Sequence, residues 1–187
     1  MTMLARFDRC LPTDLAQPDL RAARHLALLA AITAASVPPM LLLYHWLGLD
    51  AAGIAVLCAG GVMVAAPLLL RAGMGLELAS NLFIGSLFVL KTWLAVHLGG
   101  LGAATTGWFV LCPLLAGLLG GARPALVWSA LVFKAYAVLF LWGRFVAPFV
   151  AHPVTHPDVL AFAAQLGLLA MATVIVVCCV AGRDMDD

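Results

Sequence analysis

Long apolar stretches separated by short polar connections make up most of this chain. Six stretches can be outlined, at residues 25–46, 51–70, 78–97, 103–120, 124–146 and 159–181. Each has about 18 to 24 residues, the length that an α-helix needs to cross a hydrocarbon core roughly 30 Å thick. The pattern predicts an all-α integral membrane protein, a bundle of six transmembrane helices.

The connections between these stretches are too short to form domains of their own. They comprise residues 48–50, 71–77, 98–102, 121–123 and 147–158. We therefore expect one six-span membrane domain over residues 25–181, a cytoplasmic amphipathic lead-in at residues 1–24 and a cytoplasmic tail at residues 182–187. Pro113 and the Pro38-Pro39 pair lack backbone donors, so we expect kinks in the fourth and first spans.

Composition excludes an ordinary soluble domain. Hydrophobic residues make up 65% of the 187-residue chain and charged residues only 10%, which is more apolar surface than a soluble domain of this length could bury. Lipid is therefore the expected solvent. Five aromatic residues fall toward one interface, where such rings commonly anchor spans; they are Tyr44, Trp46, Trp93, Trp108 and Trp142.

The arginines indicate the orientation of the bundle, because short loops rich in Lys and Arg are retained in the cytoplasm. With six spans, seven of the eight arginines fall on one side, and Arg144 is the exception, near enough to the opposite interface to snorkel. Both termini are therefore expected to be cytoplasmic. The seven are Arg6, Arg9, Arg21, Arg24, Arg71, Arg123 and Arg183.

Two lysines fall inside predicted spans, and no Asp or Glu lies inside any span to pair with them. A lysine at the bilayer centre costs roughly 2.5 to 3.5 kcal/mol, so it should face the bundle interior or a watery cavity. Lys91 lies about 9 Å from the outer boundary and could snorkel. Lys134 lies near mid-span and is expected to line a polar cavity or an anion site, or else to be satisfied by backbone carbonyls. Asn81 and Gln165 complete the candidate ligand-binding set.

Four of the five histidines are expected on the outer face: His45, His97, His152 and His156. Imidazole binds several transition metals and titrates near neutral pH, so these side chains are candidates for a metal site or a proton sensor. The alternative is that they are solvated or cap helix ends. The sequence does not identify a cofactor.

The order of several short motifs resembles a known family, the membrane-embedded sensory region at the amino terminus of bacterial sensor histidine kinases and diguanylate cyclases. The resemblance covers about residues 8 to 182. It rests on Leu11-Pro-Thr-Asp-Leu15, on Asp19-Leu-Arg21 with Arg24, on Asn81-Leu-Phe, on Leu98-Gly-Gly-Leu101 followed by Trp108, on Cys112-Pro-Leu-Leu-Ala116 and on Gly120-Gly-Ala-Arg123.

This resemblance implies a module of the bacterial inner membrane that detects a membrane or extracytoplasmic cue, possesses six spans in contact with the lipid bilayer, and forms a homodimer. In that family the last span leads into a cytoplasmic kinase or cyclase output domain. Residues 182–187 leave no room for one. We therefore expect an output partner, or an input module separated from its output half.

Catalytic signatures such as HExxH, GxSxG and GxxxxGK[ST] do not occur in the sequence, so an enzyme is not expected. Nothing in the sequence indicates a nucleic-acid partner. The leading interpretation is a membrane sensory or signal-transducing module. The alternatives are a small transporter or channel for an anionic solute, and a membrane subunit that scaffolds a partner complex.

Overall fold

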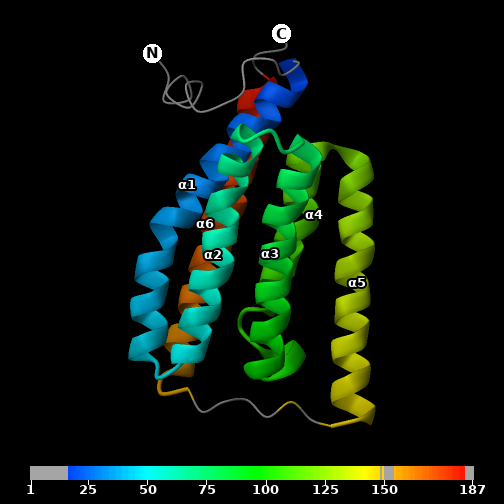
Figure 1. Cartoon of the computed structure of the whole chain (residues 1–187). Helices are drawn as coiled ribbons and strands as arrows, with labels where there is room; N and C mark the ends of the chain where they lie inside the picture. Colours follow the sequence, from blue (N-terminus) through cyan, green and yellow to red (C-terminus); the bar gives the residue numbers. More distant parts are fainter. Residues whose placement is uncertain (1–16, 148, 150–153, 184–187) are drawn as a thin grey trace.

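A computed structural model describes residues 17–147, 149 and 154–183 of the chain, and within these ranges it contains helices and no strand. The helices form one bundle (Figure 1). In chain order they are α1 (Gln17–Trp46), α2 (Asp50–Arg71), α3 (Leu76–His97), the 3-10 turns η3 (Gly100–Gly102) and η4 (Thr106–Val110), α4 (Leu111–Gly120), α5 (Ala122–Phe145) and α6 (Pro157–Arg183).

Five of these helices, α1, α2, α3, α5 and α6, are long and apolar enough to cross a membrane. A helix suits that setting because it satisfies its backbone donors and acceptors internally, where lipid offers no partner. The all-helical class is therefore confirmed, together with several helices that are long and apolar enough to cross a membrane. Residues 1–16 of the predicted lead-in (1–24) and residues 184–187 of the predicted tail (182–187) lie outside the described part of the chain. Residues 17–24 belong to α1.

The fourth apolar stretch differs from the prediction of one continuous helix over residues 103–120. Regular α-helix begins only at Leu111, and the residues before it form the two 3-10 turns, which we call the 3-10 segment (Gly100–Val110). Pro113 is the third residue of α4, directly after the 3-10 turn η4, and the kink expected there stays a prediction.

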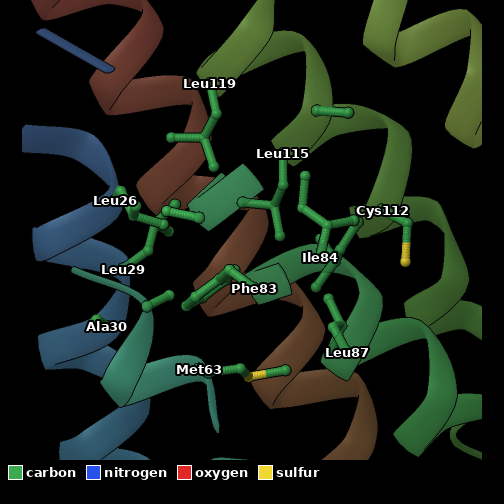
Figure 2. Packing of buried hydrophobic residues seen from close by; sticks show 14 of the residues in the cluster. Leu26, Leu29, Ala30, Met63, Phe83, Ile84, Leu87, Cys112, Leu115 and Leu119 are labelled. Carbon is green, nitrogen blue, oxygen red and sulfur yellow. The ribbon is translucent and has the colours of Figure 1, made fainter. Parts of the chain in front are cut away.

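Helix α3 lies at the centre of the bundle and α5 at its edge, while the first turn of α1 and the last turn of α6 lie at the same end (Figure 1). Half of the most apolar window of α3 is buried, against 17% for α5 and for α6. The main apolar core joins α1, α2, α3 and α4 (Figure 2), and it also includes Trp128 of α5 and Ile175 of α6. Its largest fully buried side chain is Phe83, which packs with Leu29, Met63 and Leu115.

Two of the turns between helices use the same backbone device. At the end of α1, Gly48 adopts a φ of 75°, its amide donates to His45, and the Leu49 amide donates to Tyr44. The end of α2 repeats the arrangement, with Gly73 at a φ of 99°. This is the Schellman motif, in which a left-handed glycine lets the chain satisfy the last helical carbonyls. The turns therefore reverse the chain within a few residues.

Adjacent glycines in α2 provide a test of helix packing. A Cβ added at Gly60 would lie 2.6 Å from Cγ2 of Val37 on α1, whereas one added at Gly61 meets nothing within 4 Å. We expect Gly60→Ala to lower the free energy of unfolding by about 1–3 kcal/mol, because Val37 is β-branched and cannot move aside freely. Unfolding in mixed micelles of rising SDS fraction measures this.

Gly61→Ala is the matched control for that experiment, since it adds the same methyl group one position away. It should leave the free energy of unfolding unchanged or raise it slightly, because alanine is the better helix former. Equal losses of stability in the two variants would contradict the close approach of α1 and α2 at Gly60.

Candidate functional site

A cavity of about 240 Å³ lies inside the bundle. Its lining comes from α1, α2, α3, α6, the 3-10 segment and α4, and most of it is apolar. The polar and aromatic side chains in that lining are Thr33, Ser36, Tyr44, Lys91, Thr105 and Trp108. No residue of α5 belongs to it.

Lys91 is the charged residue of the cavity lining. It lies on the inward stripe of α3 together with Leu87, Leu90 and Leu94, so the helix periodicity directs its side chain into the bundle. Only 7% of the residue is exposed. Within the described ranges, Nζ has neither a hydrogen-bond acceptor nor a carboxylate partner. In this structure Lys91 therefore faces the cavity, and the alternative that it snorkels to the head-group layer is not the one observed.

The side chain that contacts Lys91 is Trp108, whose ring centroid lies 4.0 Å from Nζ. A cation over an indole face is attracted by the ring quadrupole, and the attraction grows when water is excluded. It replaces only part of the hydration that an ammonium loses on burial. Lys91 therefore retains unused capacity to bind an anion.

Trp108 is held in place by α6. Its Nε1 donates to the carbonyl oxygen of Ala164 at 2.9 Å. One turn further along, Gly167 makes room for the ring, because a Cβ there would lie 2.8 Å from Cζ2 of Trp108. The indole is thus positioned between Lys91 of α3 and the backbone of α6.

Thr105 adds a second unused polar group to the cavity lining. The residue is 2% exposed, and its Oγ1 has no hydrogen-bond partner. The neighbouring hydroxyls differ, since Thr33 donates to Leu29 and Ser36 donates to the Thr33 carbonyl. Buried polar groups are normally paired, and leaving one unpaired costs free energy. An ammonium and a hydroxyl therefore both remain available to a ligand in an otherwise apolar cavity.

The structure does not bring the four predicted ligand-binding residues together. Lys134 is exposed on α5 and Gln165 is exposed on α6, and neither lines the cavity. Asn81 lies in a second pocket, of about 580 Å³, where its Oδ1 accepts a hydrogen bond of 3.0 Å from Nε1 of Trp128. Lys91 alone of the four faces the cavity.

The histidines have partners of other kinds. Nδ1 of His45 lies 2.8 Å from Oδ1 of Asp50, and His156 stacks on Trp46 with centroids 4.9 Å apart. His97 donates from Nδ1 to the Trp93 carbonyl at 2.9 Å. Among the described residues, no group of three His, Cys, Asp or Glu could hold a metal ion. His152 lies outside these residues, so the predicted four-histidine site stays a prediction.

The sequence analysis did not predict two residues of the cavity lining, Trp108 and Thr105. Trp108 was expected in an interfacial belt, where Trp46 and Trp142 do remain exposed, but it is half-buried beside Lys91. Thr105 had no assigned role. The signal for both was local, since Thr-Thr-Gly-Trp at 105–108 is unfavourable for the middle of a long α-helix.

Comparisons of the chain with protein-family models, with curated proteins and with solved structures found no match. The cavity and its chemistry are therefore the basis on which a function can be inferred.

Proposed function

We propose that this chain is a sensory module of the bacterial inner membrane that binds an amphiphilic anion in the cavity at Lys91. In this proposal it crosses the membrane six times, with α4 and the 3-10 segment as the short fourth span and both termini in the cytoplasm. The observation that carries the proposal is a buried, unpaired ammonium in a mainly apolar cavity at membrane depth.

The cavity favours a ligand with an anionic head and an apolar body. The head would accept from Nζ of Lys91 and Oγ1 of Thr105, neither of which has an acceptor among the described residues. Charge-assisted hydrogen bonds of this kind are the stronger ones in proteins. The remaining lining, which includes Met63, Phe83 and Leu87, would contact an acyl or isoprenoid chain. A small hydrophilic anion would leave this apolar part unfilled.

A ligand in this position could change the packing of helices at a distance. Trp108 contacts Lys91 on α3 and is hydrogen-bonded to α6, so a head group that displaces the indole from Lys91 would also act on α6. Helix shifts of about 1–2 Å are a common way to transmit such an event. Their destination would be the end where α1 starts and α6 ends, facing a cytoplasmic kinase or cyclase partner.

The test measures ligand-driven movement at that end. Spin labels on Ala72→Cys and Ala122→Cys, with the native cysteines replaced by alanine, report the distance between the α2–α3 turn and the start of α5; both residues are exposed. The chain in lipid nanodiscs is titrated with oleate and, as the uncharged control, with methyl oleate. We expect oleate to shift the distance distribution by about 1–2 Å and methyl oleate to leave it unchanged.

Two results would contradict the sensory proposal. In the first, oleate binds at saturation and the distance distribution does not move. In the second, sealed vesicles containing the protein carry a charged oleate analogue across the bilayer faster than empty vesicles do. That second result would instead support a transporter for an anionic amphiphile.

A further inference from the structure

We infer that the exposed face of α5 is a docking surface for a transmembrane helix of another protein, one that carries an Asp or Glu near the middle of the bilayer. This surface is separate from the cavity, whose lining includes no residue of α5. The inference begins with Lys134, the second lysine inside a membrane-spanning helix.

Lys134 lies at the middle of α5 and on its exposed side. Arg123 and Arg144 mark the two ends of the helix, about 16 Å and about 15 Å away at 1.5 Å per residue. A lysine side chain is too short to carry its ammonium over such a distance to either head-group layer. An ammonium facing hydrocarbon at this depth is costly, so a partner is needed there.

The residues around Lys134 form a stripe suited to helix packing. Their spacing alternates between four and three positions, which is the spacing of contact residues when two α-helices wrap around each other in a left-handed supercoil. All are exposed on the isolated chain. We call them the α5 stripe: Val127, Leu131, Lys134, Val138, Leu141 and Phe145.

The opposite side of α5 is already used within the bundle. Trp128 and Leu139 are 9% and 5% exposed. Val132 packs against the main apolar core, and Val132 and Ala135 both pack against a smaller buried cluster that contains Phe109 and Leu139. In addition, Tyr136 donates from its hydroxyl to the Thr106 carbonyl at 3.0 Å. These contacts fix the rotation of α5. The α5 stripe therefore faces outward because the inner stripe is occupied.

The chemistry of Lys134 selects the occupant. Phospholipid head groups lie at the interfaces and cannot reach the helix centre. A second copy of this chain offers no carboxylate at that depth within the described residues, because the acidic residues described there lie in the first turn of a helix; they are Asp19, Asp50, Glu77 and Asp158. The other five of its nine acidic residues, at positions 8, 14, 184, 186 and 187, fall outside the six long apolar stretches of the sequence. Two copies meeting through this stripe would place one Lys134 against the other. A different protein with a mid-span carboxylate complements the charge.

Designed single-span peptides can test this surface directly. The probe is a Leu/Ala host helix with one central Asp, and its controls carry Leu or Asn at the same position. The full chain, with a fluorescent acceptor fused at its carboxyl end, is reconstituted with donor-labelled peptide in liposomes. We expect energy transfer above the random-proximity level for the Asp peptide, and transfer near that level for the Leu peptide.

Substitutions in the chain then assign the contact to Lys134. Lys134→Met should weaken binding of the Asp peptide about tenfold, and Lys134→Arg should retain it. Lys91→Met is the matched control, because it removes the other membrane lysine and should have no effect on this binding. Circular dichroism and SDS unfolding confirm that each variant is folded, and Lys134, being exposed, should tolerate both changes.

Several outcomes would overturn the inference. One is equal transfer with the Asp and Leu peptides. Another is unchanged binding of the Asp peptide by Lys134→Met. A third is self-association of the chain through the α5 stripe, detected between donor- and acceptor-labelled copies and disrupted by Leu131→Trp, that excludes the Asp peptide.

Discussion

Replacing Lys91 by methionine is expected to abolish most of the affinity for an anionic amphiphile while leaving the bundle folded. Methionine keeps an unbranched apolar side chain of similar length beside Trp108 but removes the charge. Truncating one partner of a buried charge pair commonly costs about 2–5 kcal/mol, so we expect oleate to bind about a hundredfold more weakly, equivalent to about 2.8 kcal/mol. Titration calorimetry in nanodiscs measures this.

The same substitution should not reduce stability, which separates a binding role from a structural one. The buried ammonium has no carboxylate partner among the described residues, and replacing such a charge by an apolar group is often neutral or stabilising. Lys134→Met is the control and should bind oleate as the parent does. Loss of folding in Lys91→Met, or undiminished oleate affinity, would show that Lys91 serves another purpose.

Replacing Trp108 by alanine should produce the largest loss of stability among the cavity residues. It removes the hydrogen bond to Ala164, the contact with Lys91 and the ring packed at Gly167. Large-to-small changes at buried aromatic positions typically cost about 3–5 kcal/mol, and because Trp108 is half-buried we expect about 3 kcal/mol. SDS unfolding measures this value.

Two further variants identify the source of that loss. Trp108→Phe keeps a ring over Lys91 but cannot donate to Ala164, so it should cost about 1 kcal/mol. Trp142→Ala removes an indole that is 52% exposed on α5 and should change the free energy of unfolding by about 0.5 kcal/mol or less. If Trp108→Ala and Trp142→Ala behaved alike, the link between the 3-10 segment and α6 would be unimportant.

Sequence reasoning located the long helices because their signal is simple. Runs such as those of α2 and α3 are uniformly apolar, and Gly48 and Gly73 mark where the chain turns. The same uniformity hides which side of each helix faces inward. In a soluble protein the polar side of a helix reveals its orientation, but here lipid replaces water and both sides are apolar.

That loss of information explains why Lys134 was expected to face an internal cavity, whereas the structure places Lys91 there and Lys134 on the exposed side of α5. Depth within the span favoured Lys134 for an internal site, since depth can be counted along the sequence. Rotation decides the matter instead. The packing of Trp128 and Leu139 turns Lys134 outward on α5, while the inward stripe of α3 includes Lys91. These contacts are between distant segments, so no local pattern reports them.

The irregular 3-10 segment was missed for a related reason. Hydropathy alone extends the fourth stretch back to Ala103, but Thr105 and Gly107 are poor residues for a helix interior. Tertiary contacts then stabilise the irregular backbone, because Tyr136 donates to Thr106 and Thr106 donates to the Gly100 carbonyl. Non-helical backbone at membrane depth is tolerated only where it is buried in protein or lines a cavity.

The tight turn between α1 and α2 has a consequence for biogenesis. The amides of Gly48 and Leu49 donate to carbonyl groups of α1, and the Leu47 carbonyl accepts from the Thr155 hydroxyl. Asp50, the acidic residue at the turn, pairs with His45. Little polar surface would therefore have to be carried through hydrocarbon. We expect α1 and α2 to enter the bilayer together during translation, as a preformed helical hairpin rather than as two separate insertions.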